Sequence, residues 1–313
     1  MPAHLLPWAI LIGYVLLLLG LDYFVLHKKD SVPTTRKAFL ETLFFVGNAL
    51  LFTGAVYWFF KEGMVDNPND ITPTKAIMDY LSGYFIELSL SVDNLFVIAV
   101  IFSSFKIPSN QQHRLLFLGI LGAIVFRALL ISLGIILINK IHGMSIIFGL
   151  FLLFTAFRML KKEASHEEPH QPKGLSKLFR FTKILDGGKF VTRVDGKKVF
   201  TAMFGALIPI EFTDLLFALD SIPAIFAVTT DPFIVFSSNI FAIMGLRSLY
   251  FFLANMLERF QYLKYSVFAI LIFVSIKLMT ASFTEIPEWF SLLFIALSLA
   301  VGVYVSIWSN KKE

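Results

Sequence analysis

Nine apolar runs, each close to the length that crosses a lipid bilayer, dominate the 313-residue sequence. Because roughly 20 helical residues span the hydrocarbon core, such runs predict transmembrane helices. The sequence does not alternate with the two-residue period of a membrane β-barrel. We therefore expect an all-α polytopic membrane protein with about nine transmembrane helices. The runs lie near residues 5–27, 38–61, 79–103, 114–139, 144–160, 199–229, 233–255, 264–283 and 286–308.

Composition agrees with a membrane protein and excludes some chemistry. The chain is 57% hydrophobic and 16% charged, whereas soluble domains carry about 25% charged residues. It has no cysteine, so disulfides and thiolate metal sites are excluded. The net charge of +5 is explained by loop lysines at the cytoplasmic face rather than by nucleic-acid binding.

Basic residues predict the orientation of the chain. Twenty of the 27 Lys and Arg residues lie in loops on the C-terminal side of the membrane, and three lie on the opposite side. Cytoplasmic loops are enriched in Lys and Arg, so we expect the N-terminus outside and the C-terminus in the cytoplasm. The first run lacks a basic leader, so it is expected to remain as an anchor.

A pattern of carboxylates occurs twice inside these apolar runs. The first copy reads Phe85-Ile-Glu-Leu-Ser-Leu-Ser-Val-Asp-Asn94, and the second reads Phe212-Thr-Asp-Leu-Leu-Phe-Ala-Leu-Asp-Ser221. An ionised carboxylate in lipid is costly, so acids at this depth line a protein interior, a cavity or an ion path. Two matched copies on separate segments predict a shared cation site between two halves.

The basic residues that follow each copy indicate an internal repeat. Arg127 and Arg158 follow the first copy, and Arg247 and Lys277 follow the second, at similar spacings. The stretch from Ala123 to Arg127 resembles that from Ala242 to Arg247, with one residue inserted. Each copy spans the membrane three times, so the second copy must be inverted. Inverted repeats that meet near the membrane midplane are typical of transporters.

This 3+3 inverted repeat divides the chain into five expected parts. The dipeptide Asp195-Gly196 between β-prone runs predicts a small hairpin in the polar linker. The parts are two N-terminal transmembrane helices with an outer loop (1–78), the first repeat (79–160), the cytoplasmic linker with the hairpin (161–198), the second repeat (199–283), and a last transmembrane helix with a cytoplasmic tail (284–313).

The oxygen-rich side chains of the two copies are typical of a site for a hard cation. Carboxylate, amide and hydroxyl oxygens, with carbonyls freed by Pro209 and Pro223, suit Mn²⁺, Mg²⁺ or Ca²⁺ better than Zn²⁺ or Cu⁺. The spacing does not select among the three hard ions. The candidate metal ligands are Glu87, Asp93, Asn94, Glu211, Asp214, Asp220 and Ser221.

Four further residues are candidates for coupling or charge pairing. Arg127 and Arg247 lie near mid-span, where a guanidinium needs carboxylate or carbonyl partners. Lys277 lies nearer the outer end of its span, from which its side chain can reach the interface. Asn239 is expected to bond neighbouring helices or to assist Arg247.

Simple ion pairing is the alternative explanation of these acids. Five intramembrane acids outnumber the two mid-span arginines, which favours a cation site, and protonation when the metal leaves would give proton antiport. Asp22 and Glu41 lie near the ends of their runs, so we expect them at the membrane interface.

Several segments resemble the TerC family of integral membrane proteins, close to its Alx branch. The resemblance covers roughly 15–282 and includes Leu21-Asp22, Gln112-His-Arg114 and the stretches 86–97, 210–228 and 231–247. It implies an exporter of Mn²⁺ in the bacterial inner membrane. Family members are also associated with tellurium resistance, with metallation of exported proteins, with the response to alkaline pH and with thylakoid protein insertion. The implied motif residues are Glu87, Asp93, Asn94, Asp214, Asp220 and Ser221, and Glu211 also fits.

We therefore expect a secondary transporter, not an enzyme, that exports divalent cations, Mn²⁺ first, in exchange for protons. Its expected partners are the lipid bilayer, the metal ion and protons, without nucleic acid or an organic cofactor. The resemblance adds exported metalloproteins or the secretion machinery.

Two other functions are compatible with parts of the sequence. One is a membrane-protein assembly or metallation factor that does not itself transport. The other is an intramembrane aspartyl protease that uses Asp93 and Asp220, but the Gly-x-Gly-Asp signature is absent around both residues.

Overall fold

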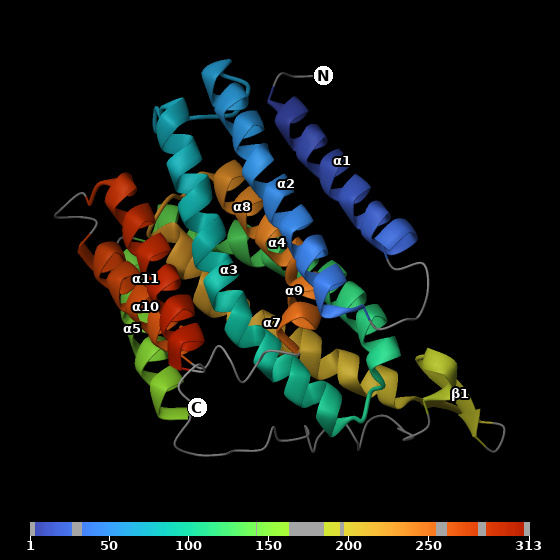
Figure 1. Ribbon diagram of the computed structural model, residues 1–313. Helices are drawn as coiled ribbons and strands as arrows, with labels where there is room; N and C mark the ends of the chain where they lie inside the picture. Colours follow the sequence, from blue (N-terminus) through green and yellow to red (C-terminus); the bar gives the residue numbers. More distant parts are fainter. Residues whose placement is uncertain are drawn as a thin grey trace.

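The computed structural model is almost entirely helical (Figure 1) and describes residues 4–26, 33–141, 143–162, 185–194, 197–254, 262–280 and 286–309. Its helices fall where the sequence has its apolar runs. They are α1 (Leu5–Leu21), which continues into the π-helix Asp22–Leu26, α2 (Thr35–Lys61), α3 (Pro73–Ser104), α4 (Ser109–Lys140), α5 (Met144–Lys162), α7 (Ala202–Phe226), α8 (Pro232–Met244), α9 (Leu246–Ala254), α10 (Leu263–Thr280) and α11 (Glu288–Ser309).

Six helical segments within the described part of the chain are long and apolar enough to cross a membrane. They are Leu5–Phe24, Thr35–Lys61, Ser109–Ile138, Ala202–Phe226, Pro232–Leu253 and Trp289–Ser309. Two shorter apolar helices cover Met144–Phe154 and Tyr265–Thr280. Helices of this kind satisfy all their backbone hydrogen bonds internally, as a bilayer requires. The architecture is that of a polytopic all-α membrane protein.

Capping side chains and prolines set the starts of three helices. The Thr34 and Thr72 hydroxyls each accept a hydrogen bond at 3.3 Å from the backbone N–H three residues later, at the starts of α2 and α3. The Asp231 carboxylate accepts one at 2.9 Å from the Ile234 N–H at the start of α8. Such caps satisfy amide groups that have no partner within the helix.

The seventh apolar run does not form one continuous helix. It divides into α8 and α9 at Gly245, which takes a turn conformation between Met244 and Leu246. The break falls inside the stretch from Ala242 to Arg247, where the second sequence copy has one residue more than the first. Helix α4 runs without interruption through the matching stretch of the first copy. The extra residue is therefore accommodated by a local break.

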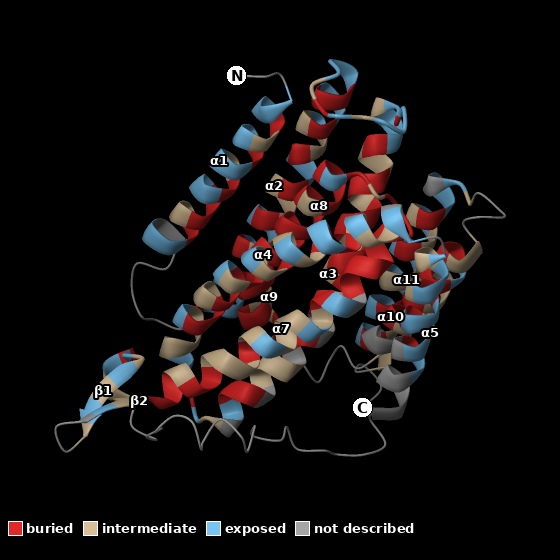
Figure 2. Cartoon of the chain, turned by 180° about the vertical axis from the view of Figure 1, so that it is seen from behind, coloured by how far each residue is buried: buried red, intermediate tan, exposed pale blue. Residues whose placement is uncertain are grey.

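Helices from the two sequence copies pack against one another. α3 packs against α7 and α8, α4 packs against α7 and α8, and α5 packs against α10. α2 covers α3, α8 and α9, while α11 covers α10 and α3. The segment Pro232–Leu253 is the most enclosed, because 89% of its most apolar stretch is buried against 22–33% in the other five spanning segments. Figure 2 shows α8 among the buried centre of the bundle.

Many large apolar residues of the described helices are exposed, and Figure 2 shows exposed residues along the outer faces of the bundle. On α4 they recur every three or four residues, at Leu121, Val125, Leu129, Leu133 and Ile136. Positions three or four apart share one face of a helix. This face is large and apolar, as a lipid-facing surface must be.

A two-stranded hairpin lies where the sequence predicts one. β1 (Val191–Val194) pairs antiparallel with β2 (Lys197–Phe200), with Val191 opposite Phe200. Residues 163–184 of the linker and the Asp195-Gly196 dipeptide lie outside the described residues.

The hairpin is fastened to the helices at its base. The Arg114 guanidinium of α4 donates a hydrogen bond at 3.1 Å to the Gly188 carbonyl and lies 5.2 Å from the centre of the Phe190 ring. Gly188 has a φ of 83°, a conformation that favours glycine. Exposed Asp186, just before it, has a lowered pKa because the Thr192 hydroxyl donates to its carboxylate.

Candidate functional site

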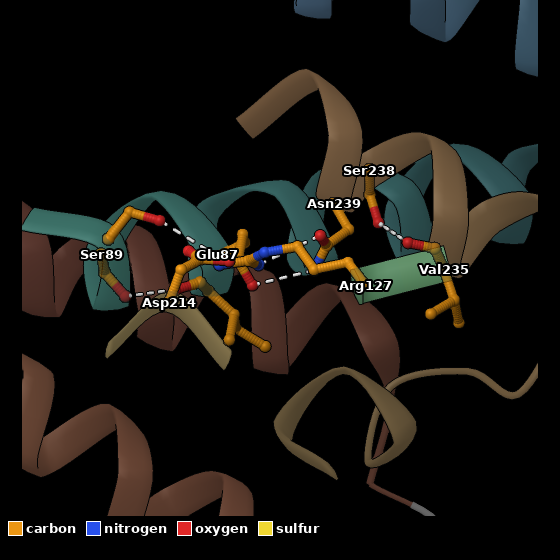
Figure 3. Close-up of polar contacts among 9 residues, drawn as sticks. Glu87, Ser89, Arg127, Asp214, Val235, Ser238 and Asn239 are labelled. Atoms are coloured by element: carbon orange, nitrogen blue, oxygen red, sulfur yellow. Dashed lines mark hydrogen bonds and ion pairs between the residues drawn. The ribbon is translucent and has the colours of Figure 1, made fainter. Parts of the chain in front are cut away.

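Arg127 occupies the place where α3, α4, α7 and α8 meet. Its side chain extends from the middle of α4 and is fully buried. Figure 3 shows it between Glu87 of α3 and Asp214 of α7, with Asn239 of α8 beside it. A guanidinium this deep needs charged or carbonyl partners, and the structure supplies carboxylates from both sequence copies. Arg127 is thus paired with two carboxylates, one from each sequence copy.

A closed set of hydrogen bonds joins these four residues. Arg127 forms an ion pair with Glu87 through Nη1. The same Nη1 donates to Asn239 Oδ1 at 3.0 Å, and Nη2 donates to Asp214 Oδ1 at 3.1 Å. Asn239 Nδ2 donates in turn to Glu87 Oε2 at 2.9 Å. Asn239 thus bonds neighbouring helices, as the sequence predicts.

Glu87 is the most completely bonded acid of the set. Besides its bonds to Arg127 and Asn239, it accepts a hydrogen bond at 3.2 Å from the Ser91 hydroxyl. Glu87 and Ser91 are four residues apart on α3, so they share a helix face. Both side chains are fully buried. Glu87 would have to exchange these partners before it could bind a metal ion.

Asp214 and Glu211 have carboxylate oxygens without such partners. Asp214 Oδ2 and Glu211 Oε2 are both buried and accept no hydrogen bond from the described residues. A buried carboxylate oxygen without a partner is costly. With Glu87, Asp214 and Arg127 all ionised, the cluster carries one surplus negative charge. Charge and unsatisfied oxygens together favour binding of a cation or a proton.

Glu211 lies directly against α4. It precedes Asp214 by three residues, about one helical turn. Its carboxylate rests against Gly122, whose lack of a side chain leaves room for it: a carbon at the Cβ position would lie 2.1 Å from Glu211 Oε2. Glu211 therefore joins the same α4–α7 contact that carries the Arg127–Asp214 pair.

The other predicted ligands are only partly placed. Asn94 on α3 and Ser221 on α7 are buried, with 5% and 2% of their surface exposed. Asp93 lies on α3 and Asp220 on α7, but their side chains lie outside the described residues. Among the residues that are described, no group of three or more His, Asp or Glu side chains is close enough to hold a metal ion. The convergence of the whole predicted set stays a prediction.

Arg247 has a different environment from Arg127. It forms an ion pair with Asp22, just after α1, and its Nη2 donates to the Asp22 backbone carbonyl at 3.2 Å. The Phe117 ring of α4 lies 5.8 Å from its guanidinium carbon. Arg247 is 1% exposed. Its carboxylate partner comes from outside the two sequence copies.

The expected interface positions of Asp22 and Glu41 are wrong. Asp22 is 2% exposed and Glu41 is 5% exposed. Arg247 attracts the first, and Lys37 lies 3.6 Å from the second. The physical reason is that Arg247 needs negative charge inside the bundle, so the ends of α1 and α2 turn their acids inward.

The extra residue in the second copy lies next to the arginine whose partners differ. An extra residue rotates the following side chain by about 100° relative to an uninterrupted helix. The break at Gly245 falls just before Arg247. In α4, which has no break, Arg127 faces α3, α7 and α8 instead.

Lys277 lies apart from the contacts described for Arg127 and Arg247. Lys277 is 7% exposed, and its Nζ donates a hydrogen bond at 3.0 Å to the Ser291 hydroxyl of α11. It is therefore buried between α10 and α11 rather than extended to the interface. The side chain of Arg158 lies outside the described residues.

Two buried positions escaped the sequence patterns. Asp79 is fully buried on α3, eight residues before Glu87. It lies at the start of the third apolar run and outside both copies of the carboxylate pattern. Gly122 has no side-chain chemistry that a sequence motif would reveal. Its position five residues before Arg127 becomes informative only once α4 is known to pack against α7.

Comparisons with known proteins agree with this architecture. The chain is 41% identical over 308 residues to an uncharacterized membrane protein of Myxococcus xanthus, covering 97% of this chain and 92% of that protein. It is 40% identical to a protein named Alx of Photorhabdus laumondii, covering 91% and 89%. An Alx of Salmonella typhi is 38% identical, covering 98% and 96%. A role as membrane-bound redox modulator has been suggested for these two relatives in their names.

No solved structure matches the chain. The family described as "Integral membrane protein TerC family" matches residues 72–313. This range includes all four helices around Arg127 and both sequence copies. The relatives cover nearly their own whole length as well as that of this chain. The resemblance inferred from the motifs is confirmed, and the chain belongs to the TerC family of multi-pass integral membrane proteins.

Proposed function

We propose that the protein is a secondary transporter that exports a divalent cation, with Mn²⁺ as the first candidate, in exchange for protons across the bacterial inner membrane. The observation that carries the proposal is the buried contact at Arg127, where acids from both sequence copies meet. Asp214 Oδ2 at this contact, and Glu211 Oε2 beside Gly122 on the same pair of helices, have no hydrogen-bond partner among the described residues. These are hard oxygen donors of the kind that Mn²⁺, Mg²⁺ and Ca²⁺ prefer.

Matching contacts in the two halves support an inverted repeat. Gly83 lies four residues before Glu87, and Ile210 lies four before Asp214; Ser238 and Gly119 precede the matching alanines of α8 and α4 by the same number. A Cβ on Gly83 would lie 2.8 Å from Ser238 Oγ, and one on Gly119 would lie 3.2 Å from Ile210 Cγ2. The same pair of positions therefore touches in both copies. Sites between such repeats are typical of secondary transporters.

The proposed exchange follows from competition for the same oxygens. In the ion-free arrangement, Arg127 neutralises part of the charge of Glu87 and Asp214. A divalent cation that enters at Asp214 and Glu211 adds positive charge, so bound protons must leave, and returning protons favour release of the metal. The chain has no cysteine. Its own residues therefore supply no thiol for the redox modulation suggested for the Alx relatives.

Proteoliposomes loaded with a Mn²⁺-sensitive dye test the proposal. We expect purified protein to move Mn²⁺ faster when a pH gradient is imposed. Asp93→Asn and Asp220→Asn are each expected to abolish this flux without reducing membrane insertion, because each removes an intramembrane charge. Asp66→Asn, which removes an exposed charge, is the matched control and should transport normally.

Two outcomes would count against this function. Wild-type flux in either intramembrane variant would move the site elsewhere. Purified protein that moves no Mn²⁺ under any pH gradient would favour the assembly or metallation role instead. A thermal-shift titration with Mn²⁺, Mg²⁺, Ca²⁺ and Zn²⁺ would then report which ion, if any, the protein binds.

A further inference from the structure

Gly122 of α4 faces α7 at the point where Glu211 lies. A carbon at its Cβ position would stand 2.1 Å from Glu211 Oε2 and 2.4 Å from both Oε1 and the carboxyl carbon. A Cβ atom does not come this close to a non-bonded atom of another residue in a packed interior. The carboxylate therefore fills space that exists only because residue 122 has no side chain.

We infer that Gly122 is a positioning residue that seats the Glu211 carboxylate in the α4–α7 contact. Gly122 lies five residues before Arg127 on α4, and Glu211 lies three before Asp214 on α7. We call the contact between Gly122 and the Glu211 carboxylate the seat. The same two helices carry the seat and the Arg127–Asp214 ion pair. The transport consequence rests on the proposed function, whereas the packing relation between Gly122 and Glu211 is independent of it.

Two other glycines on α4 also face α7, but neither holds a charged group. A Cβ on Gly134 would lie 2.4 Å from the Phe226 ring, and one on Gly119 would lie 3.2 Å from Ile210. Glycines at helix contacts in membrane proteins commonly allow close approach of the backbones. Among these three described positions, Gly122 is the one at which the neighbour is a carboxylate. Gly134 offers an equally tight but apolar contact for comparison.

The seat fixes a buried oxygen where a cation can use it. Glu211 Oε2 has no hydrogen-bond partner among the described residues, and neither does Asp214 Oδ2. A methyl group at position 122 would displace the Glu211 carboxylate and separate it from the site at Asp214. Glu211 would keep its charge, but its carboxylate would no longer lie at its present position against α4. The expected effect is therefore on affinity for the cation, in addition to helix packing.

A double-mutant cycle tests the inference with two measurements on the purified full-length protein. The variants are Gly122→Ala, Glu211→Ala and their combination, with Gly134→Ala as the matched control. The first measurement is the midpoint of thermal unfolding without metal. The second is the dissociation constant for Mn²⁺, which is obtained from the way the midpoint of thermal unfolding rises with Mn²⁺ concentration.

We expect Gly122→Ala to weaken Mn²⁺ binding about tenfold and to lower the metal-free midpoint. In the Glu211→Ala background, Gly122→Ala should lower the midpoint no further, because the methyl group has room. Gly134→Ala should lower the midpoint but leave the Mn²⁺ dissociation constant unchanged. Glu211→Asp, which shortens the side chain by one carbon, should restore part of the affinity lost in Gly122→Ala.

The two measurements separate failure of this inference from failure of the proposed function. If wild-type protein binds Mn²⁺ and Gly122→Ala binds it equally well, Gly122 has no positioning role. An equal drop in midpoint with and without the Glu211 carboxylate would also overturn the seat. If the wild type binds no Mn²⁺, the proposed function fails, and the metal-free cycle alone decides whether Gly122 seats Glu211.

Discussion

Arg127 and Arg247 occupy matching positions in the two sequence copies, yet they are held by different parts of the molecule. Arg127 bridges Glu87 and Asp214, one acid from each copy, and also bonds Asn239. Arg247 pairs with Asp22, which belongs to the N-terminal region. The first arginine joins the two halves to each other, whereas the second joins the second half to the helices that precede both.

The two arginines of the proposed repeat therefore have different structural surroundings. The helix break at Gly245 falls just before Arg247, whereas α4 runs through Arg127 without a break. The carboxylate oxygens without hydrogen-bond partners, Asp214 Oδ2 and Glu211 Oε2, lie on α7, which packs against the helix of Arg127. The Arg247 cluster, near Glu41 and Lys37, lies between α1, α2 and α9. The Arg127 cluster thus joins the two sequence copies and is where we propose ion binding, whereas the Arg247 cluster connects the second copy to the N-terminal helices.

The largest expected effect comes from removing the guanidinium at the first cluster. Arg127→Met leaves two buried carboxylates without their cation and should lower the free energy of unfolding by about 3–5 kcal/mol. Adding Glu87→Gln should recover part of the loss, because it removes one uncompensated charge. Denaturant unfolding in mixed micelles measures both effects. Unfolding of Arg127→Met at the wild-type midpoint would show that the cluster does not hold the halves together.

At the second cluster, Asp22→Asn should lower the free energy of unfolding by about 2–4 kcal/mol, because Arg247 keeps a polar neighbour but loses its charged one. The Mn²⁺ dissociation constant should stay at its wild-type value. Asp66→Asn, at an exposed carboxylate beside His4, is the control for stability. A loss of Mn²⁺ binding in Asp22→Asn as large as in Asp214→Asn would erase the functional distinction between the clusters.

Asp231 affects both clusters, because it caps α8, which carries Asn239 and is followed by α9 with Arg247. Burial raises its pKa from 3.8 to about 6. The folded protein therefore binds this proton more tightly than the unfolded chain, and stability should fall as pH rises from 3.8 to about 6. The change amounts to about 1–3 kcal/mol.

Asp231→Asn should remove this part of the pH dependence while keeping the cap, since asparagine also accepts from the helix amide. Asp231→Ala should remove both. Thermal unfolding at pH 4 to 7 distinguishes the three proteins. A slope in Asp231→Asn equal to that of the wild type would assign the titration to another group.

The smallest effect is expected at the edge of the second cluster. Lys37 is half exposed and lies 3.6 Å from Glu41. Because water around the half-exposed lysine screens its attraction for buried Glu41, Lys37→Met should change the free energy of unfolding by less than about 1 kcal/mol. A loss comparable to that of Asp22→Asn would mean that the second cluster depends on its surface lysine rather than on Arg247.

Sequence patterns predicted the parts of this site that follow from periodicity and charge. Apolar runs located the helices, and the depth of Arg127 required the carboxylate partners that it has. The partner of Arg247 was not predictable, because it depends on how α1 packs beside α9. The burial of Asp22 follows from the same packing. The seat at Gly122 depends on which face of α4 meets α7, and the relation of Asp93 to Asp220 stays a prediction.

Under the proposed function, the covalent attachment of Arg127 has a consequence for selectivity. Its guanidinium stays fixed to α4 and paired with Glu87 and Asp214, so an ion that enters at Asp214 and Glu211 does not displace it and meets a cluster that is only partly neutralised. The attraction of the remaining negative charge grows with the charge of the ion. We therefore expect a dication to compete for these oxygens better than sodium or potassium.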